Sequence, residues 1–175
     1  MMRTVEKSVI VLLLLCFAIT PAFAGNSSDY PGAHGWRLPA KPELDDSWRI
    51  SDGERYAVVA GNFHDDGHIE KVGLLVSRDK KCLGLFLLGE NKTQNSRPIF
   101  IDCNPGAIDF MGIKKVSPGK YMTACGKGYW ECDKNESPEI EIKHDAIEYF
   151  KTEGASSYFV WNRKNESFDR IWMND

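Results

Sequence analysis

Residues 61–77 have the sequence GNFHDDGHIEKVGLLVS, in which an acidic, glycine-containing loop comes directly before the apolar run Val72–Val76. A second apolar run, Tyr56–Ala60, precedes the loop. Short apolar runs joined by a segment with Asp and Gly are typical of two strands and their connecting turn. The stretch therefore predicts strand, turn and strand.

The same pattern of short apolar or alternating runs continues to the end of the chain. Strands are predicted at Arg55–Ala60, Lys71–Ser77, Leu83–Gly89, Pro98–Cys103, Phe110–Val116, Lys120–Ala124, Glu139–Lys143, Ile147–Thr152, Ser157–Asn162 and Phe168–Met173. The connections are too short for the crossovers that parallel strands need. The predicted fold class is therefore mainly β, as a single antiparallel β-sandwich or a strongly curled sheet.

Three details of this prediction concern local structure. Phe110–Val116 and Lys120–Ala124 are expected to form a hairpin around Ser117-Pro118-Gly119. The segment His144–Lys151 is compatible with a strand or a short helix. Pro42–Arg49 begins with a proline and acidic residues, which favours a short N-terminal helical turn.

The first 24 residues have the three parts of a secretory signal peptide. Arg3 and Lys7 precede the apolar run Val9–Ile19, and Ala22-Phe23-Ala24 forms a small-residue cleavage site. The predicted organisation is a signal peptide at 1–24, an extended N-terminal segment at 25–42 and a β domain at 43–175. We expect a periplasmic or secreted protein without stable membrane insertion after cleavage. The formal net charge of −3, without a block of Lys or Arg, argues against nucleic acid as a partner.

Four cysteines follow the predicted signal peptide, and an even number in an exported chain indicates two disulfides. The favoured pairing is Cys125–Cys132, across a loop with two glycines, which leaves Cys82–Cys103. A zinc site with four thiolate ligands is the alternative.

The loop after Gly61 has the spacing of a cation-binding loop. Calcium loops carry oxygen ligands at alternating positions and a glycine at position six, and Gly67 stands there. The loop resembles the D-F-N-G-D-G-x-x-D loop of FG-GAP and VCBS-type proteins, which binds calcium between two strands; it occurs once, so a propeller of repeats is not expected. The resemblance implies Ca²⁺ ligands at Asn62, His64, Asp66, His68 and Glu70, although an imidazole at His64 is a poor ligand for a hard cation.

Two alternatives for this loop remain open. The first is a tight Asp-Asp-Gly turn in which side chains cap backbone amides. The second is a transition-metal site formed by His64, Asp66 and His68.

Aromatic residues suggest where recognition and core packing occur. The Cys125–Cys132 loop presents Lys127, Tyr129 and Trp130, and the two aromatic residues are predicted either to bind a partner or to pack into the core. The closing hairpin is expected to be core through Tyr158, Phe159, Trp161, Phe168 and Trp172.

The sequence contains no Gly-x-Ser-x-Gly, His-Glu-x-x-His or phosphate-binding glycine motif. The Trp36–Pro39 opening, the Cys125–Cys132 loop and the Arg170–Met173 ending resemble small exported bacterial proteins of unassigned function. The resulting prediction is a non-enzymatic β-domain that binds an envelope protein, a toxin or hydrolase, or a glycan. A calcium-dependent structural module and a hydrolase whose site uses His64 or His144 are the alternatives.

Overall fold

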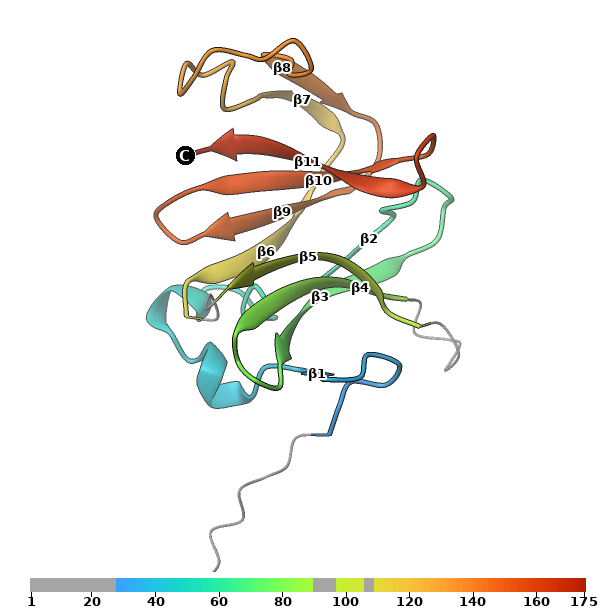
Figure 1. Ribbon diagram of the computed structural model, residues 1–175, viewed down its shortest axis with the longest axis vertical. Helices are drawn as coiled ribbons and strands as arrows, with labels where there is room; N and C mark the ends of the chain where they lie inside the picture. The colour runs from blue at the N-terminus through green and yellow to red at the C-terminus, as the bar shows by residue number, and fades with distance from the viewer. Residues whose placement is uncertain (1–27, 90–96, 106–108) are drawn as a thin grey trace, which may run out of the picture.

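The computed structural model describes residues 28–89, 97–105 and 109–175, so the predicted signal peptide lies outside the described residues. The chain is mainly β, with antiparallel sheets stacked as a sandwich (Figure 1). This confirms the predicted fold class. Among the described residues, no helix has the length and apolar character needed to cross a membrane.

The first sheet contains β1 (Trp36–Arg37), β2 (Val58–Gly61), β3 (Glu70–Ser77), β4 (Cys82–Gly89) and β5 (Ile99–Pro105). Its order is β1-β3-β4-β5, and β2 also pairs with β3. Strands β3 and β4 are buried along most of their length, as expected for continuous apolar runs covered on both faces.

The second sheet has the order β11-β10-β9-β6, formed by β6 (Met111–Val116), β9 (Ala146–Lys151), β10 (Ser156–Asn162) and β11 (Ser167–Asn174). Strands β7 (Gly119–Met122) and β8 (Glu139–Ile142) form a separate pair, at the top of the molecule in Figure 1. This pair covers the outer face of the second sheet through Ile142 and Ile140, which pack with Val116 and Val160.

The predicted hairpin between Phe110–Val116 and Lys120–Ala124 is wrong. Strand β6 pairs with β9 on one edge, and on the other the Ile113 N–H donates to the Tyr56 carbonyl at 2.8 Å. Because both edges of β6 are occupied, β7 turns away and pairs with β8 instead. The segment left open as strand or helix, His144–Lys151, contains strand β9.

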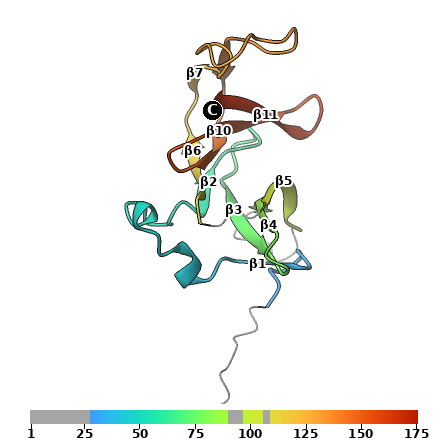
Figure 2. The same cartoon turned by 60° about the vertical axis from the view of Figure 1, so that its left-hand side comes forward.

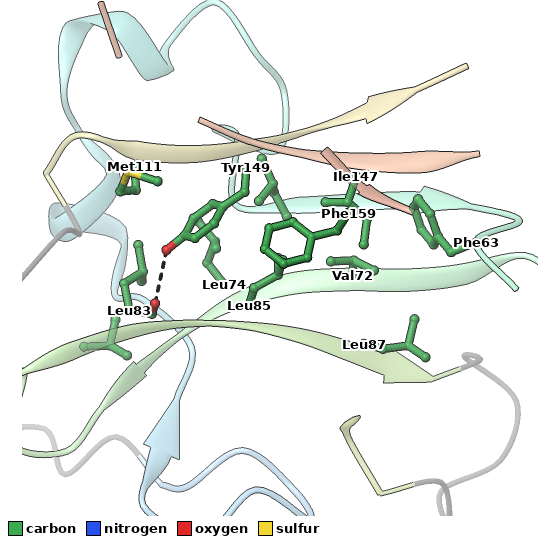
Figure 3. Packing of buried hydrophobic residues seen from close by; sticks show 12 residues of the cluster. Phe63, Val72, Leu74, Leu83, Leu85, Leu87, Met111, Ile147, Tyr149 and Phe159 are labelled. Carbon is green, nitrogen blue, oxygen red and sulfur yellow. Dashed lines mark hydrogen bonds between the residues drawn. The ribbon is translucent and has the colours of Figure 1, made fainter. Parts of the chain in front are cut away.

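The main core lies between the two sheets. Tyr149, Ile147 and Phe159 of the second sheet point toward Val72, Leu74 and Leu85 of the first (Figure 3). The Tyr149 hydroxyl donates to the Leu83 carbonyl at 3.2 Å, which satisfies the one polar group of this ring. Phe159 is core as predicted, whereas the prediction for Trp172 is wrong, since its side chain is 40% exposed.

The N-terminal segment folds into two short 3₁₀ turns, η1 (Lys41–Leu44) and η2 (Ser47–Arg49), where the sequence predicts a helical turn. The Arg37 guanidinium donates two hydrogen bonds of 2.7 Å to the carboxylate of Glu43. The buried Arg49 side chain reaches the second sheet and donates to the Met111 carbonyl at 2.6 Å. The segment is thus attached to both sheets, since Arg37 belongs to β1.

The sandwich has one connected side and one open side. On the connected side, the Ala57 and Tyr56 carbonyls accept the N–H groups of Leu74 and Ile113, at 2.9 and 2.8 Å, and so join the sheets. On the open side lie the outermost strands, β5 and β11, which the Arg170–Asp102 ion pair links at 3.0 Å. Figure 2 shows the two sheets as separate layers.

Two disulfides, Cys82–Cys103 and Cys125–Cys132, are the pairs favoured by the cysteine spacing. The first joins β4 to β5, and the second closes the loop after β7. Disulfides persist in oxidising compartments, so they indicate an environment outside the cytoplasm.

Candidate functional site

The Cys125–Cys132 loop is fixed against the end of β11. The Ala124 N–H donates to the Trp172 carbonyl at 2.9 Å. The Lys127 ammonium donates to the Met173 carbonyl at 2.8 Å and to the Asn174 side chain at 2.6 Å. Lys127, predicted to be a recognition residue, therefore holds the loop in place.

Two glycines allow this loop to form, for different reasons. A Cβ atom at Gly126 would lie 2.0 Å from the Pro138 carbonyl oxygen, so only glycine permits this approach. Gly128 has a φ of +86°, in the left-handed region that glycine adopts without steric cost. The backbone of the loop is thereby packed closely against the segment that leads into β8.

The two aromatic residues of the loop have different environments. Tyr129 is 52% exposed. Trp130 is half-buried, and its indole N–H donates to the Glu136 carboxylate at 3.1 Å. Neither ring belongs to the sheet core, so both are available at the surface.

A hollow of about 500 Å³ lies between this loop, β8 and β11. We call it the β11 groove; the residues used below are Trp130, Glu136, Ile140, Phe168, Asp169 and Trp172. Arg170 also lines it, with its guanidinium 4.1 Å from the centroid of the Trp172 ring. The same guanidinium pairs with Asp102, so its charge is already compensated.

A second hollow of about 420 Å³ adjoins the first, because both are lined by Asp169 and Ile171. Its lining includes Glu141 and His144, one of the two histidines considered for a hydrolase. The Arg163 guanidinium at this hollow donates to the Asp65 carbonyl and lies 3.2 Å from its carboxylate. The two hollows form a surface depression along β11.

The loop between β2 and β3 uses its side chains to cap its own backbone. The Asn62 side-chain oxygen accepts the N–H groups of Asp66 and Gly67, at 3.1 and 3.3 Å. The Asp66 carboxylate accepts the His68 N–H at 2.9 Å. These contacts are those of the capped Asp-Asp-Gly turn.

The other predicted ligands of this loop are turned elsewhere. His64 Nδ1 lies 2.7 Å from a carboxylate oxygen of Glu70, and its ring packs edge-on against Trp161 with centroids 4.1 Å apart. Glu70 is buried, whereas His68 is exposed. Within the part of the chain that the structure describes, no three His, Cys, Asp or Glu side chains form a group that could hold a metal ion. The Ca²⁺ and transition-metal sites stay predictions.

We expect Asn62→Ala to lower the free energy of unfolding by about 1–2 kcal/mol, because two backbone amides lose their acceptor. Urea unfolding with a chelator and with excess calcium should give the same loss. A clearly greater loss in calcium would instead assign the loop as a cation site. Asn165→Ala, in the exposed β10–β11 turn, is the matched control and should change stability by less than about 0.5 kcal/mol.

Comparisons with protein-family models, curated proteins and solved structures found no match to this chain. The resemblance of the loop to those of FG-GAP and VCBS-type proteins stays a prediction from the sequence. We therefore infer function from the geometry of the groove.

Proposed function

We propose that this chain is a non-enzymatic binding domain, periplasmic or secreted, that engages a macromolecule of the cell envelope through the β11 groove. The single observation that supports this proposal is the convergence of Trp130 and Trp172 on one hollow, beside the carboxylates of Glu136 and Asp169. Tryptophan is among the residues enriched at binding hot spots, where it supplies large contact area.

The groove is also well placed to be rigid before a partner arrives. The Cys125–Cys132 disulfide and the Lys127 hydrogen bonds fix one wall, and the β10–β11 ladder fixes the other. A surface that is ordered in the free protein loses less conformational entropy on binding. This favours recognition of a partner over a purely structural role for the loop.

The test is capture of partners from an envelope extract by the wild-type protein and by Trp130→Ala/Trp172→Ala. We expect the double variant to retain less than about one tenth of the captured material, since each hot-spot residue is worth a large part of the binding energy. Phe100→Ala is the matched control, because Phe100 is 52% exposed but belongs to β5 of the other sheet. Equal recovery with the double variant and the wild type would contradict the proposal.

Tyr129→Ala is a useful third variant. Tyr129 is as exposed as Phe100 and lies on the loop beside the groove. If the partner extends over the loop, capture by Tyr129→Ala should also decrease; if the partner stays inside the groove, only the tryptophan variants should lose it.

A further inference from the structure

The outer edge of β11 carries backbone groups that face the groove. The Trp172 carbonyl accepts the Ala124 N–H on the side away from β10, which establishes the direction of that residue's backbone groups. In a strand, residues two apart direct their N–H and C=O groups to the same side. Arg170 and Phe168 therefore direct theirs to this edge too. Among the residues that the structure describes, none bonds to the backbone of either residue there.

Exposed edges of this kind attract added strands, and proteins usually cover them. Here the cover is partial. Ala124 and Lys127 bond to Trp172 and Met173 and so block the C-terminal end of β11. The N-terminal part of the edge remains open beside the hollow, and the covering loop would set where an added strand begins.

The groove carries negative charge, which favours basic extended segments over acidic ones. The Glu136 carboxylate accepts hydrogen bonds from the Trp130 indole and the Asp133 N–H, and Asp169 accepts one from the Asn162 amide. These donors are all uncharged. In the described ranges no Lys or Arg forms an ion pair with either carboxylate, and Arg170 is paired with Asp102. A cationic side chain from a ligand would therefore complement these two carboxylates.

From the open edge and this charge we propose that β11 binds an extended, basic segment of a partner protein as a fifth strand of the second sheet. The inference rests on the proposed function and names the partner class for the same groove. Backbone hydrogen bonds to Phe168 and Arg170 hold the segment, as in other cases of strand addition. Its side chains on one face contact Trp172, and those on the other face contact Ile140 and the Asp169 carboxylate, because Trp172 and Asp169 point to opposite faces of β11 and Ile140 packs on the outer face.

The probe is a library of random peptides of about eight residues, a typical strand length, selected on the exported, disulfide-bonded protein. We expect the bound peptides to alternate apolar residues with Lys or Arg. N-methylation of those peptide amides that face β11 should weaken binding at least tenfold, whereas methylation of the intervening amides should have little effect. Hydrogen exchange at the Phe168 and Arg170 amides should slow when peptide is bound.

Variants that remove the groove charges provide a second test of the proposal. Glu136→Gln and Asp169→Asn should each weaken binding of a selected basic peptide by about fivefold and reduce its salt dependence. Glu54→Gln, an exposed acid near the N-terminal turns, is the matched control and should leave the affinity unchanged. Both groove acids are exposed, so neither variant is expected to unfold the domain.

The inference is overturned if the library yields no binder, or if binding is indifferent to N-methylation and leaves exchange at Phe168 and Arg170 unchanged. In either case, envelope capture that still depends on Trp130 and Trp172 would keep the proposed function and point to another ligand class, such as a glycan. If the peptide result fails and envelope capture also does not depend on Trp130 and Trp172, the groove is not a binding site.

Discussion

Replacing Arg49 with methionine is expected to lower the free energy of unfolding by about 3–5 kcal/mol, because it breaks a buried charged hydrogen-bond network. Arg49 has no exposed surface. Its guanidinium donates to the carbonyls of Arg55 and Met111, at 2.9 and 2.6 Å, and lies 3.5 Å from the Asp46 carboxylate. Methionine fills much of the same space but cannot donate, so the buried Met111 carbonyl and the partly buried Arg55 carbonyl would both lose this donor.

Two further variants test this account by urea unfolding. Arg49→Lys keeps the charge but not the planar fork of donors, so it should lose an intermediate amount of stability. Arg78→Met removes an arginine whose side chain is 59% exposed and pairs with Asp29 at 2.6 Å. This matched control should cost less than about 1 kcal/mol, as exposed ion pairs do. Similar losses for Arg49→Met and Arg78→Met would refute the structural role assigned to Arg49.

Arg49 also shows why part of the fold could not be predicted from the sequence. A charged residue in a polar segment is normally exposed. Its burial depends on the Met111 carbonyl, 62 positions later in the chain. The strands were predictable because alternation and apolar runs are local properties. The pairing of β6 was not, because it depends on Tyr56 and on β9, which both come from distant parts of the sequence.

The candidate site, too, was predictable from the sequence only in part. The spacing of Cys125 and Cys132 indicated a closed loop with Trp130 on it. The opposite wall was missed, since Trp172 fits the aromatic pattern of a core hairpin and only its position on an outermost strand exposes it. In the loop of residues 62–70, the spacing suits both a cation site and a capped turn. Asn62 illustrates this, because the same side-chain oxygen could serve either purpose.

The second large effect is expected at Glu43, whose contribution to stability should depend on pH. The Arg37 guanidinium, donating two hydrogen bonds, lowers the pKa of Glu43 from 4.5 to about 2, with a further contribution from the Ala40 N–H. A carboxyl with a lower pKa in the folded state stabilises the fold above the pKa of the unfolded state. That stability is lost as the pH falls toward the folded-state pKa.

Glu43→Gln should therefore destabilise the protein by about 1–3 kcal/mol at neutral pH, and the difference from wild type should shrink as the pH falls from about 5 to about 2. Urea unfolding across this range measures it. Glu54→Gln is again the matched control, because Glu54 is exposed and its side chain has no charged partner among the described residues. A loss for Glu43→Gln that stays constant over the pH range would mean that the residue acts through packing, because the ion pair with Arg37 must weaken when the carboxyl is protonated.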